Sequence, residues 1–248
     1  MKKLFYITIV VLLFSCHGEN AGDCFQTTGN IIQQEVALDA FDKILVNRDV
    51  ELILKVGNKQ KVVIETGKNL LNDVEAIVAD SQLILSDNNS CNYMREYGIT
   101  KVYVTSPNIL EIRSSTQYDV SSDGVLTYPS LTILSEDYSV PDSFTVGDFI
   151  LDIDTSRFNV LFNNLSNAYI TGKTDYLNVT YASGTSRFEG RNLMAQNVYI
   201  WNRSSNDMII NPVIEIKGKI SGTGNVICVN QPPIVEVEEQ YKGRLIFE

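Results

Sequence analysis

Residues 151–158 read Leu-Asp-Ile-Asp-Thr-Ser-Arg-Phe, and their last four letters recur as Thr-Ser-Arg-Phe at residues 185–188. In both copies a polar, turn-like cluster precedes the aromatic residue. Before each cluster lies a segment in which apolar and polar residues alternate, as at Leu151 and Ile153. Such alternation is typical of a β-strand with one buried side. The repeat therefore predicts that this half of the chain is built from strand–turn units.

The same unit recurs through the second half of the chain at a nearly constant interval. Its marker residues lie 20, 20, 30, 20 and 18 positions apart, and they are Tyr118, Tyr138, Phe158, Phe188, Met208 and Val226. We interpret the 30-residue interval as one unit plus an inserted strand at residues 168–171. A constant interval near 20 residues is typical of a β-solenoid, in which each unit makes one coil and equivalent side chains stack inside.

Two alternatives compete with this interpretation. A β-sandwich has strands every 8–12 residues and predicts no register between positions 20 apart. A carbohydrate-binding platform would place the aromatic markers outside the core. Because packing alone accounts for the interval, we expect a β-solenoid with coils of about 20 residues and with the markers in its interior.

The first half of the chain contains short runs rich in Val, Ile, Thr, Tyr and Phe, with few apolar residues at helical spacing. These runs predict β-strands separated by turns at Gly, Asn, Asp and Pro. The expected strands cover residues 43–46, 50–56, 61–66, 74–78, 82–85 and 101–105. Hydrophobic residues make up 44% of the chain, which is ample for a core. We therefore expect one all-β domain.

The N-terminus carries an export signal. Lys2 and Lys3 precede an apolar run of eleven residues, which is too short to span a bilayer as a helix and suits a signal-peptide core. Leu13-Phe14-Ser15-Cys16 then resembles a bacterial lipobox. We expect a signal peptide at 1–15, acylation of Cys16, a tether at 16–24 and a folded domain at 25–248. The alternative is an ordinary secretory signal that ends beside a chance cysteine.

The charge of the chain argues against two classes of partner. Loss of Lys2 and Lys3 with the signal changes the net charge from 20 − 30 = −10 to 18 − 30 = −12. An acidic chain with scattered lysines lacks the basic stripe that nucleic-acid binding requires. It also lacks a second, electrostatic anchor for anionic lipid. The lipid on Cys16 is therefore the expected membrane contact.

Besides Cys16, the chain contains Cys24, Cys91 and Cys228, so the body can form at most one internal disulfide. Cys24 and Cys91 lie in polar, turn-like surroundings, and we expect these two to pair. Cys228 lies in the apolar run Val226-Ile227-Cys228-Val229, where a free thiol behaves as a small buried hydrophobe.

Further sequence marks lie between residues 41 and 226, within a stretch that runs from about Cys24 to Glu248. They are Phe41-Asp42-Lys43-Ile44, Val50-Glu51-Leu52-Ile53-Leu54, Val62-Val63-Ile64-Glu65-Thr66, Asn69-Leu70-Leu71, Cys91-Asn92-Tyr93-Met94-Arg95, Val102-Tyr103-Val104-Thr105 and Ile220-Ser221-Gly222-Thr223-Gly224-Asn225-Val226. In this order they resemble the putative auto-transporter adhesin, head GIN domain proteins of Gram-negative bacteria. The resemblance implies a single-domain right-handed parallel β-helix on an exported protein, often a lipoprotein, with no catalytic residues to carry over. The sequence departs from the family in its turns, since the glycine-rich turn is clear only at residues 221–224.

Histidine, on which many catalytic sites depend, is missing from the body. The only histidine is His17, on the tether beside Cys16, which excludes Ser-His-Asp, Cys-His and histidine-based metal sites in the folded domain. The sequence also has no P-loop or dinucleotide fingerprint. We expect no catalytic residue, no metal site and no cofactor.

Carboxylates provide the one catalytic alternative. Glu136, Asp137, Asp152 and Asp154 come from adjacent repeat units, and two carboxylates about 5–9.5 Å apart support glycoside hydrolysis. The competing interpretation is that these are solvated turn charges, which we favour.

Four arginines lie near the repeated turns: Arg113, Arg157, Arg187 and Arg203. They form a candidate ligand-facing surface for an acidic glycan. The structural interpretation, which leads, is that they pair with acidic residues of neighbouring coils in exposed ion pairs worth about 0–1 kcal/mol each.

These features favour an exported, membrane-anchored lipoprotein of the outer membrane with a non-catalytic body. The body is expected to be an adhesin-like interaction or scaffold module of the cell envelope, with a glycan or an envelope protein as partner. A polysaccharide-acting enzyme and a purely structural envelope component are the alternatives. The oligomeric state is left open by the sequence.

Overall fold

The computed structural model describes residues 23–89, 91–93 and 95–248. The predicted signal peptide and Cys16 lie outside these residues. The described elements are η1 (Asp23–Phe25), β1 (Ile31–Val36), β2 (Lys43–Val46), β3 (Glu51–Val56), β4 (Lys61–Gly67), η2 (Leu71–Asp73), β5 (Val74–Ala79), β6 (Gln82–Asp87), β7 (Lys101–Ser106), β8 (Glu111–Ser114), β9 (Val120–Leu126), β10 (Ser130–Ser135), β11 (Phe149–Phe162), β12 (Ala168–Tyr181), β13 (Phe188–Asn202), β14 (Met208–Ile220), β15 (Val226–Cys228), β16 (Ile234–Glu239) and β17 (Leu245–Phe247). Neither helix among these elements is long and apolar enough to cross a membrane.

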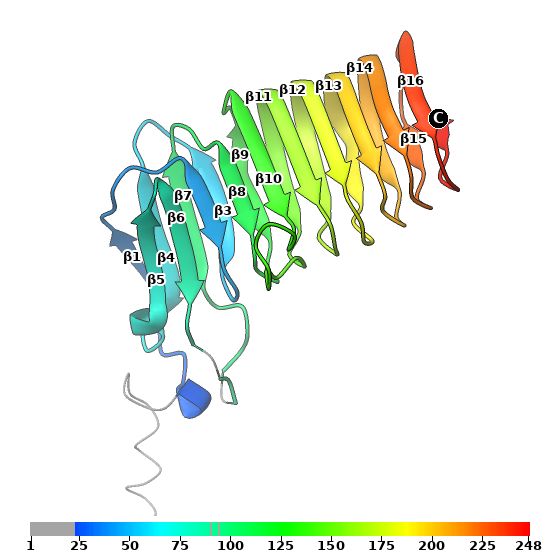
Figure 1. Ribbon diagram of the computed structural model, residues 1–248. Helices are drawn as coiled ribbons and strands as arrows, with labels where there is room; N and C mark the ends of the chain where they lie inside the picture. Colours follow the sequence, from blue (N-terminus) through cyan, green and yellow to red (C-terminus); the bar gives the residue numbers. More distant parts are fainter. Residues whose placement is uncertain (1–22, 90, 94) are drawn as a thin grey trace, which may run out of the picture.

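The strands join in one mixed sheet made of two ladders. The β16 ladder runs through β5, β6, β2, β8 and β10, then through the C-terminal parts of β11–β14, and ends at β16. The β17 ladder runs through β1, β4, β7, β3 and β9, then through the N-terminal parts of β11–β14, and ends at β15 and β17. Figure 1 shows these strands stacked side by side, with β1 and β5 near one end and β16 at the other.

The long strands β11–β14 hold the two ladders together. Each is 13–15 residues long, so its first part pairs in the β17 ladder and its last part in the β16 ladder. Paired residues on neighbouring strands lie 17–21 positions apart in the sequence. A side chain therefore meets the equivalent side chain of the next strand, and the sequence builds rows that run across the sheet.

The buried rows of both ladders form one continuous apolar core. Successive strands of the β16 ladder contribute Leu131, Phe158, Leu177, Val198 and Ile216 at one register position. The equivalent row of the β17 ladder consists of Phe149, Ala168, Phe188, Met208 and Val226. Full burial of a large apolar side chain contributes about 1.5–3 kcal/mol, so these rows fix the register of the stack. Alternate side chains face solvent because strands have a period of two.

The structure is all-β, as expected, but the prediction of a right-handed parallel β-helix is wrong because the sheet is mixed. The pairings β1–β4, β4–β7 and β5–β6 are antiparallel. The clearest cause lies between β5 and β6, where only Asp80 and Ser81 connect the strands and both have positive φ. A two-residue connection of this kind joins antiparallel strands, whereas parallel strands need a long crossover.

The marker residues were also assigned to the wrong register. Tyr138 is 90% exposed in the connection after β10, so it is not a core residue. Phe158 and Phe188 are both buried, but Phe158 lies in the β16 ladder and Phe188 in the β17 ladder. Residues 155–156 lie within β11 rather than in a turn, and residues 168–171 begin β12 rather than forming an insertion. The apparent 30-residue interval therefore compares positions in two different rows.

Candidate functional site

The outward side of the β16 ladder carries a cluster of aromatic and basic side chains over β11–β14. We call it the aromatic–cationic face, and it consists of Arg157, Tyr176, Tyr199, Trp201, Arg203, Lys217 and Lys219. On each strand, these residues alternate with buried residues. Because successive side chains of a strand point to opposite sides of the sheet, they face solvent while their neighbours fill the core. Tyr176 and Tyr199 are each 50% exposed, which is a large open area for a tyrosine ring.

Cations lie against two rings of this face. The guanidinium carbon of Arg157 is 5.1 Å from the centre of the Tyr176 ring. The Nζ atom of Lys219 is 4.6 Å and the guanidinium carbon of Arg203 is 5.7 Å from the centre of the Trp201 ring. Such contacts contribute about 0.5–1 kcal/mol at exposed sites and limit the orientations of both partners. The face is therefore partly preorganised.

Two hollows lie on this face. One, of about 200 Å³, lies over β11–β14 and is lined by Arg157, Asn159, Tyr176, Asn178, Tyr199 and Lys217 among others. The other, of about 380 Å³, lies between the strands and the connection that follows β10. Its lining includes Leu161, Ala182 and Arg203, which lie in or next to the strands, and Tyr138 of the connection. A ligand on the face would thus meet apolar, aromatic and charged groups together.

Arg113 and Glu136 form a buried ion pair beside the second hollow. The Arg113 Nη1 atom lies 2.6 Å from the Glu136 Oε1 atom, and the two side chains are 12% and 5% exposed. The Ser139 backbone N–H donates to Glu136 Oε2 at 2.8 Å, and the Ser139 hydroxyl donates to Oε1. Burial raises the pKa of Glu136, but the bonds from Ser139 and Arg113 outweigh it and lower the pKa to about 2. Glu136 is therefore a fixed anion that holds the connection against β8.

The structure separates the four candidate arginines. Arg157 and Arg203 lie on the aromatic–cationic face. Arg113 lies further along the row that contains Trp201 and Lys219, and it is paired there with Glu136. Arg187 lies elsewhere, just before β13, and contacts Glu189 of the β17 ladder at 2.8 Å. The four residues do not form one stripe, and two of them are available on the outward face.

The carboxylates of the enzyme alternative also lie apart. Glu136 and Asp137 follow Ser135, which pairs with Phe162 at the C-terminal end of β11. Asp152 and Asp154 lie near the start of the same 14-residue strand, and Asp154 contacts Lys173 at 3.2 Å. The four carboxylates are therefore divided between the two ends of β11, and they do not combine into one group. Within the described ranges, no group of three or more His, Cys, Asp or Glu side chains could hold a metal ion.

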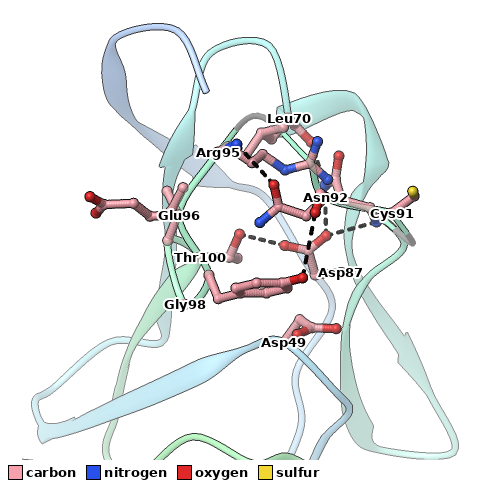
Figure 2. A pocket seen from close by; sticks show the side chains of 12 residues that line it. Asp49, Leu70, Asp87, Cys91, Asn92, Arg95, Glu96, Gly98 and Thr100 are labelled. Carbon is pink, nitrogen blue, oxygen red and sulfur yellow. Dashed lines mark hydrogen bonds between the residues drawn. The ribbon is translucent and has the colours of Figure 1, made fainter. Parts of the chain in front are cut away.

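A separate, smaller hollow of about 110 Å³ lies beside the loop after β6 (Figure 2). Two of the carboxylates that line it, those of Asp87 and Asp49, have internal hydrogen-bond partners. Asp87 accepts bonds from the Thr100 hydroxyl at 2.5 Å and from the side-chain amide of Asn89 at 2.6 Å. Asp49 accepts a bond from the Gln117 side-chain amide at 2.6 Å, and Glu96 points away from the hollow in Figure 2. This polar network ties the loop to the neighbouring strands and makes a weak candidate for a ligand site.

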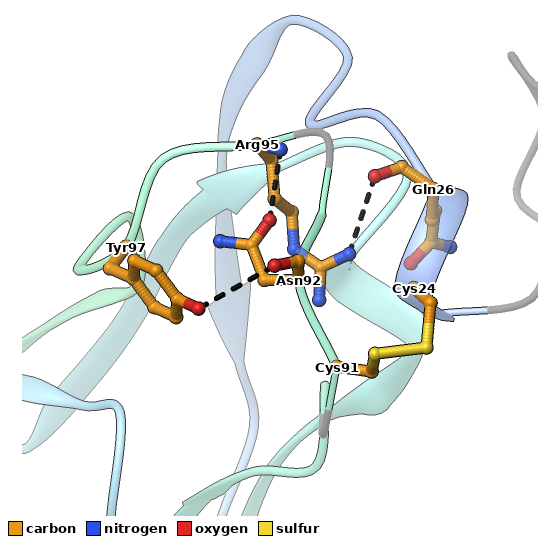
Figure 3. Close-up of a disulfide and its surroundings, with 6 residues drawn as sticks. All are labelled: Cys24, Gln26, Cys91, Asn92, Arg95 and Tyr97. Atoms are coloured by element: carbon orange, nitrogen blue, oxygen red, sulfur yellow. Dashed lines mark hydrogen bonds between the residues drawn. A yellow bond between two sulfur atoms is a disulfide. The ribbon is translucent and has the colours of Figure 1, made fainter.

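The same loop is joined to the start of the domain by a disulfide between Cys24 and Cys91 (Figure 3). Arg95 donates from Nη1 to the Gln26 backbone carbonyl at 3.3 Å, which adds a second link between these segments. Cys228 is a buried free thiol in β15, and burial raises its pKa to about 12. It is therefore not a reactive nucleophile at neutral pH.

Sequence reasoning missed the aromatic residues of the candidate site. Tyr176, Tyr199 and Trp201 each stand at a position where the alternation calls for a polar residue. The available signal was an aromatic residue at a strand position that faces solvent, because packing of the core does not require a large side chain there. The marker residues of the 20-residue interval are instead core residues for the most part, and the exposed one, Tyr138, lies in a connection rather than on a strand.

The structure is that of an all-β protein whose candidate site lies on the outward surface of a sheet. The chain belongs to the family described as putative auto-transporter adhesin, head GIN domain, which matches residues 40–232. No curated protein matches the chain.

Solved structures show the same fold. A putative adhesin from Bacteroides fragilis superimposes with a TM-score of 0.78 at 20% identity, over 90% of this chain and 99% of that one. A putative lipid binding protein from Parabacteroides distasonis gives a TM-score of 0.57 at 14% identity, over 89% and 98% of the two chains. A putative adhesin from Parabacteroides merdae gives 0.55 at 15% identity, over 89% and 98%.

Proposed function

We propose that the protein is an envelope-anchored binding module and that its aromatic–cationic face binds a glycan bearing carboxylate groups. One observation carries the proposal: exposed aromatic rings and the cations of Arg157, Arg203 and Lys219 lie together on one surface of the sheet. Aromatic faces present apolar area to sugar rings, and Arg and Lys pair with carboxylates. Membership of an adhesin-like family supports a binding role over catalysis.

At the face itself, Glu215 and Glu236 lie 2.8 and 3.8 Å from Lys217 Nζ and offset its charge, so three other cations remain for the ligand. Arg157, Arg203 and Lys219 lie within the face, whereas charges beyond about 8 Å are screened at physiological ionic strength. Binding should therefore depend on the local cations. It should weaken with added salt without being lost, because ring stacking is insensitive to salt.

The test measures binding of the full chain to a panel of neutral and carboxylated glycans. The same measurement is then made on the variants Trp201→Ala and Tyr199→Ala. We expect each variant to bind a carboxylated glycan at least tenfold more weakly. Tyr169→Ala is the matched control, because Tyr169 is exposed on the β17 ladder and lies outside the face. Equal losses in all three variants, or no glycan binding by the unaltered chain, would refute the assignment.

Anchoring through Cys16 is the second part of the proposal. It is supported by the lipobox-like Leu13-Phe14-Ser15-Cys16 after a short apolar run. Palmitate labelling of cells should mark the unaltered chain and leave Cys16→Ala unlabelled, and protease treatment of intact cells then reports which side of the outer membrane the domain occupies. Label retained in Cys16→Ala would contradict the anchor.

The second hollow favours one further candidate ligand, an acyl chain. Leu161, Ala182 and the Tyr138 ring give it an apolar lining, and one solved structure of this fold is described as a putative lipid binding protein. Displacement of a fluorescent fatty acid, abolished by Leu161→Asp but not by Trp201→Ala, would favour the acyl chain over the glycan.

A further inference from the structure

The end of the β16 ladder leaves a strand edge open. Within the described residues, β16 pairs with β14 on one side, and Figure 1 shows it at the far end of the stack from β1 and β5. The N–H of Gln240, directly after β16, donates to the carbonyl of Ile220 at 2.8 Å. This bond shows which residues of the strand point their backbone groups toward β14, because the direction alternates along a strand. Even-numbered residues of β16 therefore bond to β14. Val235, Val237 and Glu239 direct their N–H and C=O groups toward the open edge.

The side chains of β16 continue the rows of the sheet. Val235 and Val237 extend the buried rows of Ile216 and Gly218, and Val235 is 40% exposed because no described strand follows it. Glu236 and Glu238 extend the outward rows that contain Lys217 and Lys219 on β14. An added strand would thus complete the core with apolar residues and face two carboxylates on its other side.

The chain itself shows which residues suit these carboxylates. Strand β14 presents Lys217 and Lys219 at the positions beside Glu236 and Glu238, and Lys217 Nζ lies 3.8 Å from Glu236 Oε2. Opposite charges on neighbouring strands stabilise pairing, and like charges oppose it. The complementary segment therefore alternates apolar residues with Lys or Arg, as Ile216-Lys217-Gly218-Lys219 does on the other side.

We propose that the open edge of β16 binds an extended basic segment of a partner protein by strand addition. Exposed edges accept such strands readily, with backbone bonds for affinity and alternate side chains for specificity. A second copy of this chain is a poor occupant. The edge strands at the other end of the sheet, β1 and β5, carry Glu35 and Glu75, and two β16 strands would oppose Glu236 and Glu238 to one another.

The probe is a fluorescent, end-blocked peptide of sequence Lys-Ile-Lys-Val-Lys-Ile, titrated against the full chain. We expect saturable binding, and at least tenfold weaker binding by Val237→Pro. Proline removes an N–H that faces the open edge, and edge strands tolerate proline at such positions. The double variant Glu236→Lys/Glu238→Lys should lose binding to a similar extent, which decides the question if Val237→Pro fails to fold by circular dichroism.

The control is Glu75→Lys, which makes one replacement of the same kind on β5 at the opposite end of the sheet and should leave peptide binding unchanged. A peptide with Glu in place of Lys should not bind. Absence of saturable binding, equal binding by the acidic peptide, unchanged binding by a folded Val237→Pro, or an equal loss in Glu75→Lys would each overturn the proposal. Dimerisation of the unaltered chain through this edge would overturn it in favour of a second copy.

Discussion

Gly218 lies within β14 with a φ of +128°, pressed against the backbone of β13. A Cβ atom at this position would lie 1.9 Å from the Ile200 carbonyl oxygen, whose own backbone is held in the ladder. The backbone can relieve this contact only by breaking the pairing of β13 and β14. Glycine is therefore required here both by the conformation and by the space.

Gly218→Ala should lower the free energy of unfolding by about 3 kcal/mol or more, because strain at positive φ and the steric contact add. Gly124→Ala is the control, since Gly124 also has positive φ but has nothing within 4 Å of the added Cβ. We expect that control to lose only about 1 kcal/mol. Urea denaturation of both variants measures the difference, and equal losses would show that the close approach to β13 is unimportant.

The buried pair of Arg113 and Glu136 predicts a pH dependence of stability. The pKa of Glu136 is lowered from 4.5 to about 2, so the folded state favours the ionised carboxylate. Its contribution, up to about 3 kcal/mol, is complete above pH 4.5 and is lost as the pH falls from 4.5 toward 2. Glu136→Gln should flatten the stability profile in this window. Parallel profiles for the two proteins would contradict the assignment.

At the scale of elements, the disulfide joins η1 to the loop after β6 across 67 positions. Closing a loop of this length in the unfolded chain removes conformational entropy worth about 4 kcal/mol in the chain-entropy model. The joint replacement Cys24→Ser/Cys91→Ser should therefore lower the free energy of unfolding by about 2–5 kcal/mol. A reducing agent should destabilise the unaltered chain by a similar amount and leave the double variant unchanged. A reductant effect on the double variant would show that other thiol chemistry is involved.

The short strands of the first half could be predicted from sequence almost to the residue, because each is bounded by turn residues. Residues 43–46 were expected and β2 has these bounds, while residues 101–105 were expected and β7 extends one residue further. The first strand, β1, was missed because its Ile31-Ile32-Gln33-Gln34 lacks clear alternation. The direction of pairing was harder to predict. The alternation of apolar and polar residues marks a strand, but it does not indicate the partner strand or whether the two run parallel or antiparallel.

The candidate site was predicted less well than the strands. Arg157 and Arg203 were identified, but their neighbours Tyr176 and Trp201 were not, because the face is assembled from residues about 20 positions apart in a register that the sequence alone misassigned. In β11 the alternation shifts by one residue at the passage between ladders, where Ser156 and Arg157 are both exposed. This polar segment has the sequence pattern of a turn, which hides that one strand continues from one ladder into the other.

At the scale of the whole molecule, stability should vary along the stack. Strands β12 and β13 are paired on both sides over most of their length, whereas β16 is paired on one side. Hydrogen exchange should therefore be slowest in β12 and β13, and within β16 it should be fastest at Val235, Val237 and Glu239. Amides of the even-numbered residues of β16 should exchange more slowly than these three. Equal exchange rates at all residues of β16 would contradict the inference that only its even-numbered residues bond to β14.

The parallel stacking of β11–β14 also fixes a pitch for anything that lies along it. Neighbouring strands are about 4.8 Å apart, so outward groups recur at this step from Arg157 through Tyr176 to the later strands. A polymer whose repeating unit spans a small multiple of the step can touch successive strands at once, and each contact raises the effective concentration for the next. Chain length, as well as chemical composition, then determines how tightly such a polymer is held.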